Sequence, residues 1–138
     1  MSITVTDPDS RLREERVRMP EPSETPDTQI WVHERLPGFH RWPEAPARLA
    51  FLADRHRHVF DVRVFVRVGH ADRDVEFFAL AEDVRKWWGA GERECGNASC
   101  EALAHQLGDH LISSGLAVSS VQVAVDGEGG AVADWPMP

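Results

Sequence analysis

A regular alternation of side-chain types from His56 to Val68 is the feature that most limits how this chain can fold. Apolar and histidine side chains occupy every second position, and most positions between them are charged. The first set comprises His56, His58, Phe60, Val62, Val64, Val66 and Val68, and the second includes Arg57, Asp61, Arg63 and Arg67. Because successive side chains of a strand point to opposite faces of a sheet, this period of two predicts a long antiparallel strand with one buried face.

Shorter patterns on either side of this strand predict the other elements. We expect a strand that opens at Ile30 and is interrupted at Pro37 and Gly38, a partner strand over 75–77 and a final strand over 118–125. Apolar spacings of three and four residues predict one helix over 78–88 and a second that follows the N-cap residue Ser99. This order predicts the α+β class, with an antiparallel four-stranded sheet and two helices on one face.

The first 28 residues differ in composition from the rest of the chain. They contain four prolines, seven acids and four arginines, with few large apolar residues. Such a segment cannot bury enough surface to offset the entropy lost on ordering it. We therefore expect residues 1–28 to be a disordered, acidic, proline-rich tail and residues 29–138 to form one folded domain.

The charge and hydropathy of the chain exclude some partners. Acidic residues outnumber basic ones by 23 to 15, which argues against binding to nucleic acid or to an anionic membrane. No apolar run approaches the roughly 20 residues that span a bilayer, and no apolar segment follows Met1. The two cysteines make no disulfide framework. We therefore expect a cytoplasmic protein.

Histidine is unusually frequent in this chain, with seven copies. His56 and His58 are two residues apart on the predicted strand, which places both imidazoles on one face with Cα atoms about 7 Å apart. With His40 as a third ligand, they would leave the fourth tetrahedral position of a zinc ion open for water or substrate. The alternative is that His56 and His58 are polar surface residues at the start of a strand, because this short motif is weak by itself.

The other chemically capable residues have simpler structural explanations. We expect Cys95 and Cys100 to be unreactive free thiols, and Glu101 to be an acid in the first turn of a helix. Trp87 and Trp88 are expected to cover the sheet or a subunit contact. The four remaining histidines are not expected to share a metal ion; they are His33, His70, His105 and His110.

The order of these segments resembles the family of 6-pyruvoyltetrahydropterin and 6-carboxytetrahydropterin synthases, which has the tunnelling fold. That family has a histidine about fifteen residues before a His-Gly-His that opens its second strand, and here His40 stands sixteen residues before His56. Residues 75–80 and 98–104 are similar to the segments at the starts of the family's two helices. The valine-rich segment 121–125 falls where the family has its last strand.

The resemblance implies a fold, a cofactor and a substrate class. It implies a homo-oligomer in which the sheet assembles edge to edge into a barrel, with Zn²⁺ bound by His40, His56 and His58 near a subunit interface. It implies a lyase acting on a pterin or deazapurine precursor, the usual substrate being 7,8-dihydroneopterin triphosphate. Glu101, Asp126 and Glu128 are the residues that it places near the heterocycle.

The chain also departs from the family at positions that matter for catalysis. Leu52 stands where the family has its active cysteine, and residues 93–97 contain no histidine where the family has an Asp-His pair. Val125 aligns closest to the family's pterin-anchoring glutamate. Two alternatives to an enzyme therefore stay open: a non-catalytic tunnelling-fold subunit that binds a heterocycle or serves assembly, and a histidine-rich α+β domain unrelated to the family.

Overall fold

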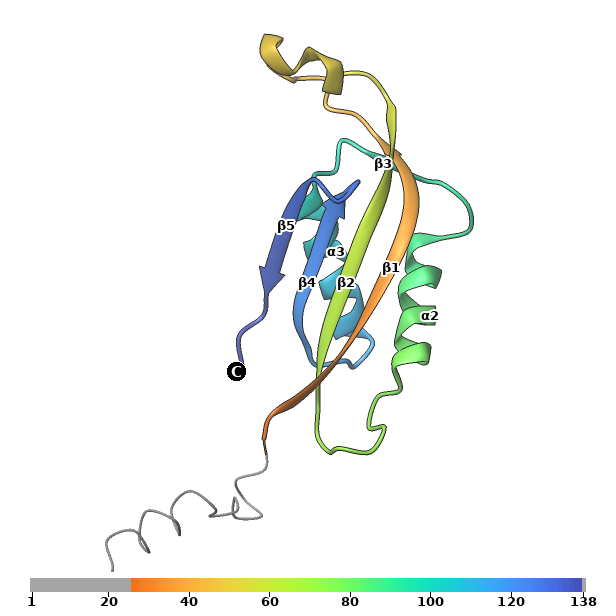
Figure 1. Ribbon diagram of the computed structural model, residues 1–138, viewed down its shortest axis with the longest axis vertical. Coiled ribbons are helices and arrows are strands. Elements are labelled where there is room, and N and C mark those ends of the chain that lie inside the picture. Colours follow the sequence, from red (N-terminus) through yellow and green to blue (C-terminus); the bar gives the residue numbers. More distant parts are fainter. Residues whose placement is uncertain (1–25, 138) are drawn as a thin grey trace, which may run out of the picture.

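A five-stranded open sheet with two α-helices and a short 3-10 helix forms the described part of the protein, which covers residues 26–137 of a computed structural model (Figure 1). The α+β class predicted from the sequence is confirmed. The strands are β1 (Thr28–His40), β2 (His56–Val68), β3 (Arg93–Gly96), β4 (Val118–Val125) and β5 (Gly129–Asp134). The helices are α2 (Phe77–Trp88), α3 (Cys100–Ser113) and the short 3-10 helix η2 (Ala47–Leu52).

The sheet differs from the predicted four antiparallel strands in number and in direction. Its order is β3-β1-β2-β4-β5, and β3 pairs in parallel with β1, so the sheet is mixed. The strand predicted over 75–77 is wrong, because Phe77 begins α2. The Glu76 carboxylate caps that helix by accepting hydrogen bonds from the N–H groups of Phe78 and Ala79, at 2.8 and 3.0 Å.

The β4–β5 hairpin explains how the unpredicted strand β5 joins the sheet. Asp126 and Gly127 have φ angles of 51° and 70°, and Glu128 donates its N–H to the Val125 carbonyl at 2.9 Å. Two consecutive positive φ angles are typical of a type I′ turn, which favours the dipeptide Asp-Gly. The sequence therefore carried a hairpin signal at the point where the chain was expected to leave the sheet.

Strands β1 and β2 form the longest pairing of the sheet. Their register runs from Thr28 opposite Val68 to His40 opposite His56. The interruption predicted at Pro37 and Gly38 is absent, since β1 continues through both. A proline is tolerated in an edge strand, and among residues 26–137 only the last three residues of β1 pair with β3.

Both helices pack on one face of the sheet and enclose a single core. The even-numbered residues of β2 from Phe60 to Val66 are buried there, with at most 1 % of their surface exposed. Helix α2 lies along β1, and α3 lies across β4 and β5 (Figure 1). The helical side chains of the core are Leu80, Ala81, Val84, Trp88, Leu103, Ala104, Leu107 and Leu111.

The predicted tail lies almost wholly outside the described residues. Only residues 26–28 of it belong to the described part, and Thr28 already begins β1. Across the described residues, no helix has the length and apolar character needed to cross a bilayer.

Candidate metal centre

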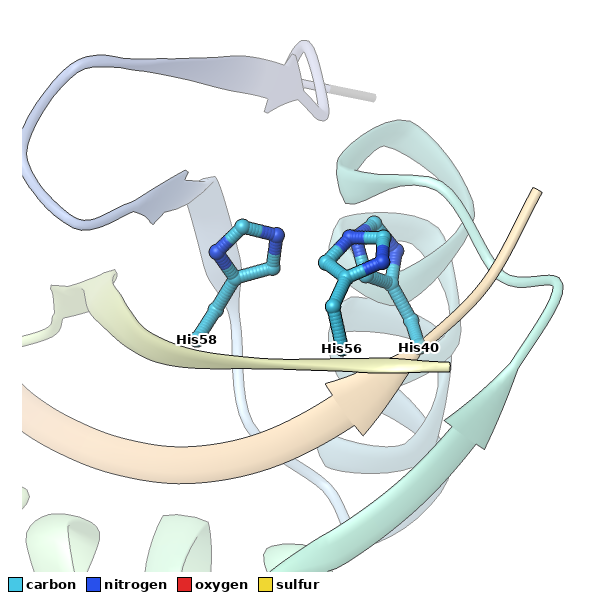
Figure 2. Close-up of side chains that lie close together, drawn as sticks. All are labelled: His40, His56 and His58. Atoms are coloured by element: carbon cyan, nitrogen blue, oxygen red, sulfur yellow. The ribbon is translucent and has the colours of Figure 1, made fainter. Parts of the chain in front are cut away.

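Three histidines meet at the end of the sheet where β1 finishes and β2 begins. Register places His40 directly opposite His56, and His58 lies two residues further along β2 on the same face. The ring centroids of His40 and His56 are 4.4 Å apart, and His58 is 4.7 Å from each of them (Figure 2). The predicted grouping of these three histidines is therefore present. Within residues 26–137, they form a set of potential metal-ligating side chains whose ligand atoms all lie within 4.8 Å of one another.

The Nδ1 atom of each ring faces an oxygen outside the cluster. His56 Nδ1 is 2.7 Å from the Asp54 carbonyl, and His40 Nδ1 is 3.5 Å from the Ala98 carbonyl. His58 Nδ1 is 2.5 Å from Oδ2 of Asp126. Carbonyl and carboxylate oxygens only accept hydrogen bonds, so each Nδ1 acts as the donor and the lone pair of each neutral ring lies on Nε2.

The Nε2 atoms of His40 and His56 are buried and have no hydrogen-bond partner. A buried polar atom without a partner costs free energy, and native structures rarely leave one unexplained. Imidazole Nε2 atoms that converge while their Nδ1 atoms donate to outer oxygens form the usual environment of a metal-bound histidine. The side chains present therefore fit a bound cation.

The electrostatics of the cluster favour the neutral form of the His40 ring. Burial, the largest cause, lowers the pKa of His40, and the neighbouring His56 and His58 lower it further. The hydrogen bond to the Ala98 carbonyl acts in the opposite direction. Since a protonated imidazole has no lone pair to donate, a lowered pKa keeps His40 in the state that binds metal.

Asp126, in the turn that follows β4, is held against strand β2 by two hydrogen bonds to Val59. Its N–H donates to the Val59 carbonyl and its Oδ1 accepts from the Val59 N–H, both at 2.9 Å. The hydrogen bond from Val59, the largest cause, lowers the pKa of Asp126, and the one from His58 lowers it further. An ionised carboxylate therefore stands behind the His58 ring.

The core and two ion pairs hold this end of the sheet together. Phe60 lies beneath the cluster, with its ring centroid 6.0 Å from that of His40 and 5.8 Å from that of His58. The Arg55 guanidinium pairs with Glu94 at 2.5 Å. A second pair, Arg57 with Glu92 at 3.0 Å, also links the β2 end to the segment around β3. These pairs are solvent-exposed, so each stabilises this end of the sheet only weakly.

The acids that the resemblance placed near a heterocycle occupy different positions. Glu101 is exposed in the first turn of α3, three residues beyond Ala98, whose carbonyl faces His40. Glu128 lies in the hairpin turn and lines a hollow of about 530 Å³ together with Asp61, Arg63 and Gln122. None of the three histidines lines that hollow. Only Asp126 is brought into contact with the cluster.

The remaining candidates lie outside the cluster. His33 pairs with Asp61 at 3.0 Å, His70 lies 3.5 Å from Asp74, and His105 and His110 are exposed on α3. Burial raises the pKa of both Cys95 and Cys100, so neither supplies a thiolate near neutral pH.

The two tryptophans cover the sheet, as one of the two predicted roles requires. Trp88 is 3 % exposed in the core and its Nε1–H donates to the Pro37 carbonyl at 2.8 Å. The partly buried Trp87 packs against the core, and the Arg93 guanidinium lies 4.3 Å from the centroid of its ring.

Sequence reasoning missed the groups that orient the three histidine rings. Two of them are backbone carbonyls, of Asp54 and Ala98, and no side-chain pattern marks a carbonyl. The third, Asp126, was considered only as a contact of the heterocycle. The Asp-Gly dipeptide was the available sequence signal for its position, because a turn there places Asp126 where β4 ends, beside the start of β2.

No protein-family model matches the chain, and comparison with curated proteins finds no match.

Proposed function

We propose that this protein binds Zn²⁺ through His40, His56 and His58 and acts on a pterin or deazapurine precursor, as a divergent relative of the 6-pyruvoyl- and 6-carboxytetrahydropterin synthases. The observation that carries the metal site is the pair of buried Nε2 atoms without partners. The choice of zinc rests on the donor set, since three imidazoles with one open tetrahedral position suit a catalytic zinc.

The substrate class rests on the sequence resemblance together with the arrangement of elements. The four longer strands follow one another as β1-β2-β4-β5, each antiparallel to its neighbour, with both helices on one face. Four antiparallel strands with two helices on one face are what the resemblance implies for a tunnelling-fold subunit, which would assemble into a homo-oligomeric barrel. Glu101, near the end of the sheet that carries the histidines, and Glu128 in the hairpin are the remaining candidates for contacts to the heterocycle.

The chemistry divides between the ion and the chain. When bound, Zn²⁺ would supply a Lewis acid that polarises a hydroxyl or carbonyl group of the substrate. The chain supplies three imidazoles, each oriented by an outer oxygen, and the apolar ring of Phe60 beneath them. It lacks the family's thiol at Leu52, so a changed reaction or substrate is part of the proposal.

A non-catalytic role is the second candidate function, and the state of the cysteines favours it. Both thiols are half-buried and pack against the core, with raised pKa values. Within residues 93–97, the structure also has no imidazole to act as an acid or base. A subunit that binds a heterocycle at the metal without converting it would need neither group.

Metal analysis of the purified full-length protein tests the metal site. We expect about one zinc per subunit in the wild-type chain and loss of the metal in the His56→Ala, His58→Ala double variant. The matched control is His105→Ala, His110→Ala, which removes two exposed histidines from α3 and should retain the metal. Wild-type protein with less than about a tenth of an equivalent of metal would contradict the site, because its three imidazoles together should hold one ion in each subunit.

Turnover measurements separate the two candidate functions. The metal-loaded protein is incubated with 7,8-dihydroneopterin triphosphate, other reduced pterins and guanine nucleotides. Conversion that disappears in the His56→Ala, His58→Ala variant supports the enzyme. Binding without conversion supports the non-catalytic subunit.

A further inference from the structure

His58 is the one histidine of the cluster that a side chain orients. His40 and His56 face the backbone carbonyls of Ala98 and Asp54, which no substitution removes. His58 instead faces Oδ2 of Asp126, at 2.5 Å. The proton on its ring is therefore placed by a group that mutation can change.

The carboxylate of Asp126 has two different tasks. Its Oδ1 accepts from the Val59 N–H at 2.9 Å, while Oδ2 faces His58 Nδ1. The Asp126 backbone is anchored as well, because its N–H donates to the Val59 carbonyl at 2.9 Å. With φ at 51°, Asp126 occupies a left-handed conformation that only glycine, asparagine and aspartate adopt readily. The hairpin turn therefore directs this carboxylate at the ring.

We propose that Asp126 is a positioning residue for the metal site, holding His58 in the tautomer protonated at Nδ1 so that the Nε2 lone pair faces His40 and His56. This inference rests on the proposed metal-binding function. It assigns the Asp126 carboxylate to the ring of His58 rather than to a heterocycle.

The charged and titratable groups around His58 are consistent with this assignment. Across the cluster it faces two other imidazoles, whose Nδ1 atoms are engaged outward. Its strand neighbour Arg57 pairs with Glu92 at 3.0 Å. Asp126 is thus the hydrogen-bond acceptor that the structure gives His58 Nδ1 within the described residues.

Asp126→Asn is the discriminating substitution, because it keeps size and backbone preference while changing one atom from acceptor to donor. The Val59 N–H requires an acceptor, so the amide oxygen takes the Oδ1 position and the amide NH₂ faces His58. Nδ1 must then accept, and the ring proton moves to Nε2. We expect affinity for Zn²⁺ and Co²⁺ to fall about 10- to 100-fold, the usual cost of losing such an outer partner.

Asp61→Asn is the matched control. Asp61 also pairs with a histidine, His33, at 3.0 Å, but on the opposite face of the sheet. The same chemical change there should leave metal affinity unaltered. Affinities are measured by competition with a chromophoric chelator, using the full-length chain.

The tautomer itself is read from ¹⁵N chemical shifts of the histidine rings in the metal-free, full-length protein, at a pH above the usual histidine pKa. We expect His58 to carry its proton on Nδ1 in the wild type and on Nε2 in Asp126→Asn. Wild-type His58 protonated at Nε2 overturns the inference, and so does Asp126→Asn with wild-type affinity. If the variant does not fold, the wild-type ¹⁵N spectrum alone tests the tautomer of His58. The same spectrum tests it in the case where the wild-type protein binds no metal and the proposed function fails.

Discussion

At the scale of single residues, Gly38 allows three elements to approach one another beneath the three histidines. A Cβ atom at this position would lie 2.9 Å from Trp88 Cζ2, 3.0 Å from the Arg93 carbonyl oxygen and 3.1 Å from Phe60 Cε2. Contacts this short are repulsive, and two of the three partners are buried core side chains. The absence of a side chain lets α2 and β3 pack closely against β1.

We therefore predict that Gly38→Ala lowers the free energy of unfolding by about 1–3 kcal/mol, the usual cost of overpacking. Urea denaturation measures this change in the free energy of unfolding. Gly129→Ala is the matched control, because its Cβ would meet no atom within 4 Å. Its effect should stay within about 0.5 kcal/mol, and equal effects of the two substitutions would contradict the role of the close approach.

Two of the three proposed ligands could be predicted from a local pattern, because strand geometry places His56 and His58 on one face. The spacing of His40 from them gained meaning only from the resemblance to the synthase family. Two of the three outer partners are distant in the sequence and could not be predicted in the same way. Ala98 lies 58 residues from His40 and Asp126 lies 68 from His58, so only the folded sheet brings them together.

At the scale of elements, a strong local periodicity was sufficient to predict a strand or helix from the sequence, whereas a weak periodicity was not. Strand β2 has the predicted bounds, and α3 begins after Ser99, whose side chain accepts from the Ala102 N–H at 3.1 Å. Residues 75–77 were misassigned because a short run of valine and phenylalanine is typical of a strand, whereas Glu76 is an uncommon N-cap. Strand β3 has only four residues, too few for an alternation to be detected.

The Glu76 cap leads to a test of how α2 begins. We predict that Glu76→Ala lowers the free energy of unfolding by about 0.5–2 kcal/mol, because two N–H groups of the first turn lose their acceptor. Glu76→Asp should restore most of the loss, since aspartate is a preferred N-cap. Glu82→Ala is the control, an exposed glutamate whose contact with Lys86 is 3.9 Å long. Thermal denaturation with equal losses at both positions would rule out the cap.

At the scale of the whole molecule, exposed apolar side chains lie on or beside the outer strands of the sheet. Trp31 in β1 is 58 % exposed, Phe78 in α2 is 71 % exposed and Val132 in β5 is 61 % exposed. Trp31 and Phe78 line one groove of about 620 Å³ beside β1. Strand edges of this kind invite pairing with another chain, and native proteins usually cover or charge them. Edge-to-edge assembly of identical subunits, as proposed above, would cover both edges of the sheet.

We predict that native mass measurement of the full-length protein gives a multiple of the 15.5 kDa subunit mass. Lysine at an edge opposes pairing because its charge loses hydration when another strand covers it. Val132→Lys and Phe78→Lys should therefore shift the protein towards one subunit. Ile112→Lys, which alters an apolar residue that is 39 % exposed on α3, should leave the assembly intact. A wild-type protein with the mass of one subunit would contradict the barrel, while metal binding by the three histidines of that subunit would stand.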